Sequence, residues 1–262
     1  MKGSLERAAK EQGLSELSFR LERCVPDITD QYSSYKIDTP YLRKSVRYLH
    51  AFQISLVGEV INELARPVIA DIGDSAGTHL QYIKDIYGPG KVMRCIGINF
   101  DLKAVERIRK RQLEAVCVRA EDLSSQNIKA DLFLCFETLE HLTDPIDFLW
   151  KLSSRTDAAY LVATVPYTRK SKVGLLHIKR NKKEPVCAEN THIFEFSPQD
   201  WKLIVKHSGW AIVKEKIYLQ YPKKGFFNLT KPLWRKFDFE GFYGFILKRD
   251  DSWSSKYKDW RQ

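Results

Sequence analysis

The chain has 262 residues, of which 44% are hydrophobic and 29% charged, and this composition is typical of a folded globular protein rather than a disordered one. Its formal net charge of +10 favours anionic over cationic ligands. The five cysteines are scattered without a C-x-x-C pair, and every apolar run is shorter than the about 18 residues that a membrane span needs. The sequence therefore predicts a cytoplasmic protein without a disulfide framework, a zinc site or a transmembrane segment.

The N-terminal quarter of the chain is expected to be helical. Apolar residues recur at helical spacing from Thr39 to Leu64, with Thr39 placed as an N-cap and Pro40 at the first helical position. This pattern predicts either one long helix or two short ones before the first strand. We expect residues 1–65 to form a helical cap on the domain that follows.

After this cap, strand patterns alternate with helix patterns. Strands are predicted at 67–72, 92–98, 115–118, 130–136, 158–165, 211–218 and 242–248, and helices at 79–87, 102–112, 145–154 and 197–209. Such alternation is typical of an α/β fold with a mostly parallel sheet and helices on both faces. We expect residues 66–250 to form this domain, with an insertion at 219–240 and a polar tail at 251–262.

A turn rich in small residues joins the first strand to the first helix. Residues 71–78 read DIGDSAGT, and small residues at such a turn let the backbone approach a ligand whose anionic group meets the helix N-terminus. A dinucleotide site of the form G-x-G-x-x-G would need a glycine at Thr78. The pattern acid-h-G-x-G-x-G instead matches from Asp71 to Gly77, with Ser75 in place of the middle glycine. In this motif the chain resembles the class I S-adenosylmethionine-dependent methyltransferases.

The resemblance covers about residues 67–248 and implies a Rossmann-like, seven-stranded, mostly parallel sheet with one antiparallel strand. It also implies where S-adenosylmethionine binds. Asn99 stands where the family has an acid that binds both ribose hydroxyls, and residues 119–123 resemble the loop that contacts the adenine. The cofactor-binding residues that the resemblance implies are Asp71, Gly73, Ser75, Gly77, Asn99, Phe100, Asp101, Ala120, Glu121, Asp122 and Phe136.

The end of the fourth predicted strand reads ETLEHL from Glu137 to Leu142, which is similar to the E-x-L-E-H-L signature of many small-molecule methyltransferases. Ligands of such sheets lie beyond the carboxyl ends of the strands, so Glu137 and His141 are expected to face the pocket. A neutral imidazole there could accept the acceptor's proton, and His192 is a second candidate base. The alternative is that each histidine only makes local hydrogen bonds.

The same residues leave a metal-dependent alternative open. Glu137, Glu140, His141 and His192 follow the order of the metal-binding residues in the small-RNA methyltransferases that modify the terminal ribose 2′-oxygen. Because E-x-x-E-H also occurs in metal-free relatives, we predict no metal ligand. RNA ribose 2′-O-methylation is therefore kept as the second candidate function.

Charge placement favours an anionic acceptor. Between Tyr167 and Thr191 there are seven lysines and arginines against two glutamates, and the resemblance places this loop beside the acceptor pocket. Basic and aromatic residues are interleaved at 221–239. We expect the aromatic residues to pack against the domain, and contact with an anionic lipid surface or single-stranded nucleic acid is the alternative.

These patterns predict an enzyme that methylates an oxygen or nitrogen of an anionic small molecule such as a sugar or lipid-linked intermediate. Ser75 and Asn99 depart from the family pattern. A non-catalytic binding module therefore remains a further alternative.

Overall fold

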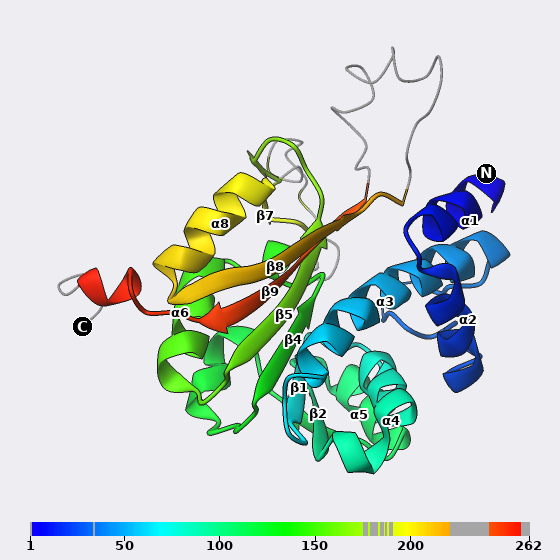
Figure 1. Cartoon of the computed structure of the whole chain (residues 1–262), viewed down its shortest axis with the longest axis horizontal. Helices are drawn as coiled ribbons and strands as arrows, with labels where there is room; N and C mark the ends of the chain where they lie inside the picture. The colour runs from blue at the N-terminus through cyan, green and yellow to red at the C-terminus, as the bar shows by residue number, and fades with distance from the viewer. Residues whose placement is uncertain are drawn as a thin grey trace.

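The computed structural model describes residues 2–33, 35–174, 178, 183, 186, 188, 191–220 and 241–257. Its centre is a seven-stranded sheet with the strand order β3-β2-β1-β4-β5-β9-β8 (Figure 1). Neighbouring strands from β3 to β5 run parallel, whereas β9 is antiparallel to both β5 and β8. The predicted α/β class, with a mostly parallel sheet and one antiparallel strand, is confirmed.

The sheet strands are β1 (Val68–Ile72), β2 (Arg94–Asn99), β3 (Glu114–Cys117), β4 (Leu132–Phe136), β5 (Tyr160–Pro166), β8 (Trp210–Tyr218) and β9 (Phe242–Arg249). A separate antiparallel ribbon pairs β6 (Lys172–Val173) with β7 (Phe194–Glu195). The helices are α1 (Lys2–Glu11), α2 (Ser15–Cys24), α3 (Pro40–Ile61), α4 (Thr78–Lys91), α5 (Leu102–Lys110), α6 (Pro145–Arg155) and α8 (Pro198–His207). Short 3₁₀ helices are η1 (Ala120–Ser125), η2 (Leu139–His141) and η5 (Ser254–Lys256).

Helices cover both faces of the sheet. Helices α3, α4 and α5 lie on one face, and α6 and α8 lie on the other (Figure 1). The two central strands β4 and β5 are almost wholly apolar, and all five residues of β4 and all seven of β5 are buried. Continuous apolar runs of this kind are expected where a parallel sheet is covered on both sides.

The apolar pattern from Thr39 to Leu64 forms one long helix, α3, rather than two short ones. Thr39 is its N-cap, since its hydroxyl accepts a hydrogen bond of 3.2 Å from the Leu42 amide, and Pro40 is the first helical residue. The helix packs against β5 and against β9, which lies near the C-terminal end of the chain. At Gly244 of β9, an added Cβ would lie 2.5 Å from the Leu56 side chain and 2.8 Å from the Phe52 ring.

One difference from the predicted element limits has a local cause. Helix α4 continues to Lys91 through a kink at Gly88, whose φ of 69° is open to glycine without strain. Helix α8 is delimited as predicted, because Ser197 caps its start by accepting from the Asp200 amide and Gly209 follows its end at a φ of 85°. None of the helices in the described residues is long and apolar enough to cross a bilayer. The predicted insertion at 219–240 lies almost wholly outside the described residues.

The close packing of α3 on β9 can be tested at Gly244. Gly244→Val is expected to lower the free energy of unfolding by about 1–3 kcal/mol, because the added side chain overlaps Leu56 and Phe52 and forces the helix away from the sheet. Urea unfolding followed by circular dichroism measures the change. Gly90→Ala is the control, since nothing lies within 4 Å of a Cβ added there. A Gly244→Val protein as stable as the wild type would contradict this packing.

Candidate functional site

The turn between β1 and α4 depends on two glycines. Gly73 and Gly77 have φ values of 85° and 73°, a region that residues with a Cβ rarely adopt. Gly73 also lies against the loop after β4, where an added Cβ would be 2.3 Å from the Thr138 hydroxyl oxygen. By contrast, Ser75 keeps a negative φ, so the missing middle glycine costs this turn no strain.

Two side chains, Asp74 and Arg107, hold the same turn in place. The Asp74 carboxylate accepts hydrogen bonds from the amides of Ala76 (3.2 Å) and Gly77 (2.7 Å), which fix the backbone of the turn just before α4. Arg107 of α5 donates to the Ser75 carbonyl through Nε and Nη2, at 3.1 and 2.9 Å. The turn is therefore rigid although it lacks the full glycine pattern.

Two carboxyl groups of this turn are buried with an oxygen that no described residue hydrogen-bonds. These atoms are Asp71 Oδ2 and Asp74 Oδ2, and the two residues are 1% and 2% exposed. Burial raises the pKa of Asp74 to about 7, and the neighbouring Asp71 carboxylate acts in the same direction. His79 Nδ1 lies 3.4 Å from Asp71 Oδ2, so the pair is not closed by a good hydrogen bond. A cation entering the turn would meet both oxygens.

The Asn99 side chain is engaged at both ends. Its Nδ2 donates to the Asp74 carbonyl at 3.0 Å, and its Oδ1 accepts from the Asp101 amide at 2.8 Å. Asp101 in turn caps α5 and accepts from the Ser33 hydroxyl, which belongs to the segment before α3. Phe100 stays 58% exposed at the same edge, where its ring is open to a flat ligand.

The remaining residues of the predicted cofactor set lie at the ends of β3 and β4. Ala120, Glu121 and Asp122 begin η1, and Glu121 pairs with Arg119 at 3.3 Å. Phe136 ends β4, and its ring meets the His79 ring edge-on at 4.9 Å between centroids. Because β1, β2, β3 and β4 are parallel, their C-terminal ends lie at one edge of the sheet, as expected for such ligand sites.

Glu137 follows β4 in a strained conformation. Its φ of 47° lies in the left-handed region, which is uncommon for a non-glycine residue. Its amide donates to the Thr164 carbonyl of β5 at 2.9 Å, and its carboxylate accepts a hydrogen bond from the Thr164 side chain. The Thr164 hydroxyl oxygen accepts in turn from Gln53 Nε2 of α3 at 3.0 Å. Strain held by neighbours in this way is often found at functional sites.

Glu137 and Glu140 form a second pair of buried carboxyl groups. Burial raises the pKa of Glu137 to about 8, against the hydrogen bond from Thr164. Burial also raises the pKa of Glu140 well above its usual range, and the charge of Glu137 adds to this. Within the described parts of the chain, no hydrogen bond reaches Glu137 Oε1 or either carboxylate oxygen of Glu140.

The two candidate bases, His141 and His192, lie side by side although 50 residues separate them. Their ring centroids are 4.9 Å apart and nearly perpendicular. The segment before β7 is tied to η2 by two hydrogen bonds, from the Ile193 amide to the Glu140 carbonyl (2.7 Å) and between His141 Nδ1 and the Thr191 carbonyl (3.0 Å). Burial lowers the pKa of His141, and the neighbouring His192 adds to this, which favours a neutral ring.

Glu195 of β7 holds His192. His192 Nδ1 lies 2.9 Å from Glu195 Oε1, and the other oxygen of Glu195 pairs with Lys172 of β6 at 2.6 Å. Although burial opposes it, the hydrogen bonds with His192 and Lys172 lower the pKa of Glu195 to about 2. Glu195 is therefore an anion, and His192 donates its Nδ1 proton to it.

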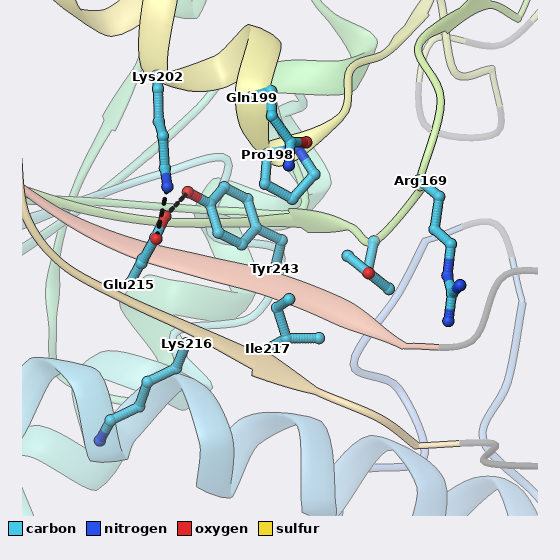
Figure 2. Close-up of a pocket in the computed structure, with 9 residues that line it drawn as sticks. Arg169, Pro198, Gln199, Lys202, Glu215, Lys216, Ile217 and Tyr243 are labelled. Atoms are coloured by element: carbon cyan, nitrogen blue, oxygen red, sulfur yellow. Dashed lines mark hydrogen bonds and ion pairs between the residues drawn. The ribbon is translucent and has the colours of Figure 1, made fainter.

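An open cavity of about 520 Å³ lies apart from these residues, between α8 and the β8–β9 pair. Figure 2 shows Lys202 and Tyr243 directed at the Glu215 carboxylate, while Lys216 points away from it. Lys216 pairs with Glu59 of α3 at 2.5 Å. Because these charges are already paired, we do not assign the acceptor to this cavity.

Sequence reasoning missed several residues that shape the site. Gln53 lies on the same stripe of α3 as Arg47 and His50, and all three are buried. Their spacing of three residues places them on one side of a helix, and this spacing is the signal in the sequence that could have identified them. The roles of Asp74, Arg107, Thr164 and Glu195 depend on partners that only the fold brings together. Much of the basic loop at 167–191 lies outside the described residues, and its predicted role stays a prediction.

Comparison with known proteins identifies the fold. A family model described as a methyltransferase domain matches residues 53–215, which is more than half of the chain. No curated protein sequence matches. Among solved structures, the chain is similar to magnesium protoporphyrin IX methyltransferase from Synechocystis with bound S-adenosylmethionine, at a TM-score of 0.55 and 13% identity over 90% of this chain and 93% of that chain.

Two further structures cover most of the chain. The N1-methyltransferase for 1,6-didemethyltoxoflavin from Burkholderia thailandensis, with bound S-adenosylhomocysteine, has a TM-score of 0.53 and 12% identity over 79% of both chains. The small RNA methyltransferase HEN1 has a TM-score of 0.50 and 15% identity over 77% of this chain and 25% of its own. At such identities the likeness shows the fold alone. The family match, the strand order and the turn after β1 together place the chain in the class I methyltransferases, whose cofactor is S-adenosylmethionine.

Proposed function

We propose that the chain transfers the methyl group of S-adenosylmethionine to an oxygen or nitrogen of an anionic small molecule. The observation that carries this proposal is the pair of imidazoles at His141 and His192. His141 Nδ1 lies 3.0 Å from the Thr191 carbonyl oxygen and His192 Nδ1 lies 2.9 Å from Glu195 Oε1, so hydrogen bonds orient both rings beyond the C-terminal end of β4. A neutral imidazole in such a place suits removal of a proton from an incoming acceptor.

The turn after β1 fits the amino-acid end of the cofactor. Each of the Asp71 and Asp74 carboxyl groups has a buried oxygen without a hydrogen-bond partner among the described residues, and an ammonium group could supply one. The exposed ring of Phe100 and the half-buried Glu121 lie where the ribose and adenine would follow. When bound, S-adenosylmethionine supplies a methyl group on a positively charged sulfur.

The acceptor reacts beyond the end of β4. Its oxygen or nitrogen forms a bond to the methyl carbon while the carbon–sulfur bond breaks, and S-adenosylhomocysteine leaves with the bonding electrons. The acceptor's proton passes to Nε2 of His141 or His192. Glu137 is proposed to orient the acceptor, because Thr164 fixes its carboxylate and its strained backbone directs it from the strand end.

An anionic acceptor is favoured by the net charge of +10 and by the basic loop between β5 and β7. A phosphate, a nucleotide-sugar or a carboxylate would each suit this charge. Incubation with S-adenosylmethionine that carries a labelled methyl group, against pools of such compounds and against RNA, tests the class. Label in RNA alone would favour ribose methylation instead.

Calorimetric titration with S-adenosylhomocysteine separates an enzyme from a binding module without turnover. Binding without label transfer to any pool would favour the module. No detectable binding at millimolar ligand would reject the proposed function.

The engagement of Asn99 leads to a prediction on cofactor affinity. Asn99→Asp is expected to weaken S-adenosylhomocysteine binding about tenfold, because a carboxylate would place an acceptor against the Asp74 carbonyl and lose one hydrogen bond. Calorimetry measures the dissociation constant. Asn62→Asp, the same change at an exposed position after α3, is the control. Tighter binding by Asn99→Asp would show that this side chain contacts the ribose as the family's acid does.

The role of His141 leads to a prediction on turnover. His141→Ala is expected to lower kcat by about 100-fold or more while cofactor affinity stays nearly unchanged, because the imidazole acts on the acceptor rather than on the cofactor. Single-turnover methyl transfer and S-adenosylhomocysteine titration give the two quantities. His207→Ala, at the end of α8, is the control. Unchanged kcat in His141→Ala would reject this role.

A further inference from the structure

We infer that Gln53 on α3 is a positioning residue that couples the turn after β1 to the acceptor side of the site. Its side-chain amide lies between His79 of α4 and Thr164 of β5 and makes a hydrogen bond to each of them. Thr164 continues the connection to Glu137, which is proposed to orient the acceptor. The inference rests on the proposed function and deepens it, because it names a residue that joins the two halves of the site.

The Gln53 amide gives this connection a direction. Its Nε2 lies 3.0 Å from Thr164 Oγ1, and its Oε1 lies 2.9 Å from His79 Nε2. An amide nitrogen only donates and an amide oxygen only accepts, so Thr164 Oγ1 accepts and His79 Nε2 donates. The hydroxyl hydrogen of Thr164 is therefore available to the Glu137 carboxylate, which accepts a hydrogen bond from this side chain.

The other end of the connection reaches the turn after β1. His79 is the second residue of α4, and its Nδ1 lies 3.4 Å from Asp71 Oδ2, an oxygen that no described residue hydrogen-bonds. An ammonium group that binds Asp71 would change the charge that one nitrogen of the His79 ring faces. The opposite nitrogen of the same ring contacts Gln53. A ligand in the turn is thus only two side chains away from Thr164.

Burial makes these hydrogen bonds hard to replace. Gln53 is 1% exposed, and Thr164 and His79 are buried as well. A buried polar atom that loses its partner cannot turn to water instead, so the loss is costly. The rings of His50 and Phe136 lie 4.6 and 4.9 Å from the His79 ring between centroids and limit its movement. The positions of the linking groups therefore depend on one another.

Glu137 depends on this support because its backbone is strained. Its φ of 47° lies in the left-handed region, and its Oε1 is buried without a hydrogen-bond partner among the described residues. The Thr164 carbonyl accepts from the Glu137 amide at 2.9 Å, and the Thr164 side chain donates to its carboxylate. Without the Gln53 amide, the Thr164 side chain loses one of the hydrogen bonds that orient it. We expect Glu137 then to hold an acceptor less accurately.

Binding of S-adenosylhomocysteine to the full chain tests the coupling without an acceptor. Thr164→Val removes a hydroxyl and Gln53→Met removes the amide, and both keep the approximate shape of the side chain. Each is expected to weaken binding about three- to tenfold, because each disturbs the contact that holds the His79 ring beside Asp71. Since Thr164 reaches the turn only through Gln53, the double variant should bind no more weakly than Gln53→Met alone. Calorimetry measures the dissociation constants.

Methyl transfer tests the acceptor side. It is measured with saturating labelled S-adenosylmethionine and the pool of phosphates, nucleotide-sugars or carboxylates that accepts label from the wild type. Saturation removes the effect of cofactor affinity, and Gln53→Met is still expected to lower kcat about tenfold through the loss of orientation. Thr164→Val should lower it at least as much, and the double variant no further than Thr164→Val. A purely structural role of Gln53 would give losses that add.

Matched changes away from the connection are the controls. Gln81 Nε2 on α4 donates to the exposed Asp85 at 2.7 Å, and Thr156 Oγ1 donates to the Leu152 carbonyl at 2.6 Å. Gln81→Met and Thr156→Val should therefore bind S-adenosylhomocysteine and transfer the methyl group as the wild type does. Circular dichroism verifies that each variant is folded. If Gln53→Met does not fold, Thr164→Val decides alone, and wild-type affinity in it would overturn the inference.

The outcomes separate this inference from the proposed function. Additive losses of affinity, in a protein whose wild type transfers the label, would overturn the coupling and leave the proposed function intact. Non-additive losses without label transfer to any pool would leave the coupling intact and count against the proposed function. A wild type that binds no S-adenosylhomocysteine at millimolar ligand would reject both.

Discussion

Four carboxyl groups at one edge of the sheet each have a buried oxygen that no hydrogen bond from the described residues reaches. Asp71 lies near the end of β1 and Asp74 in the turn after it, and Glu137 and Glu140 follow β4. Burying a carboxylate without a partner costs free energy. Protonation of the carboxyl group or binding of a cation would remove this cost. The ammonium group of the cofactor is a suitable partner for Asp71 and Asp74. Glu137 and Glu140 could be paired by a cation or by a hydrogen-bond donor of the acceptor. These unpaired carboxyl oxygens support the proposal that this edge of the sheet is the binding site.

Much of this arrangement could be predicted from the sequence because it depends on local patterns. Alternating strand and helix patterns predicted the class of fold, which is confirmed. The turn from Asp71 to Gly77 predicted where the cofactor binds, and this stays a prediction. The proximity of His141 and His192 also followed, since the family resemblance places both near the acceptor. The strand, helix and turn patterns each depend on residues close together in the sequence, and parallel strands place their C-terminal ends at one edge of the sheet.

What could not be predicted depends on contacts between distant segments. From the sequence, Asn99 is predicted to bind the ribose in place of the family's acid. In the fold, its amide hydrogen-bonds the Asp74 carbonyl and the Asp101 amide, and so links the turn after β1 to the start of α5. Glu195 reads as one residue of a short strand, and its link to His192 appears only once the ribbon has formed. Hydrogen bonds of this kind are chosen by three-dimensional position, which a periodic pattern does not record.

Helix α3 has a consequence for how this chain can be divided. The sequence predicts a boundary near residue 65 between a helical cap and the methyltransferase domain. In the fold, however, α3 packs against one face of β5 and β9. Its Gln53 also donates a hydrogen bond to Thr164, which in turn donates one to Glu137. A shortened protein that starts at the first strand would leave that face bare to water and Glu137 without its support. Expression of the domain in isolation thus has to begin ahead of Thr39, and any graft of this catalytic edge onto another scaffold must bring the helix with it.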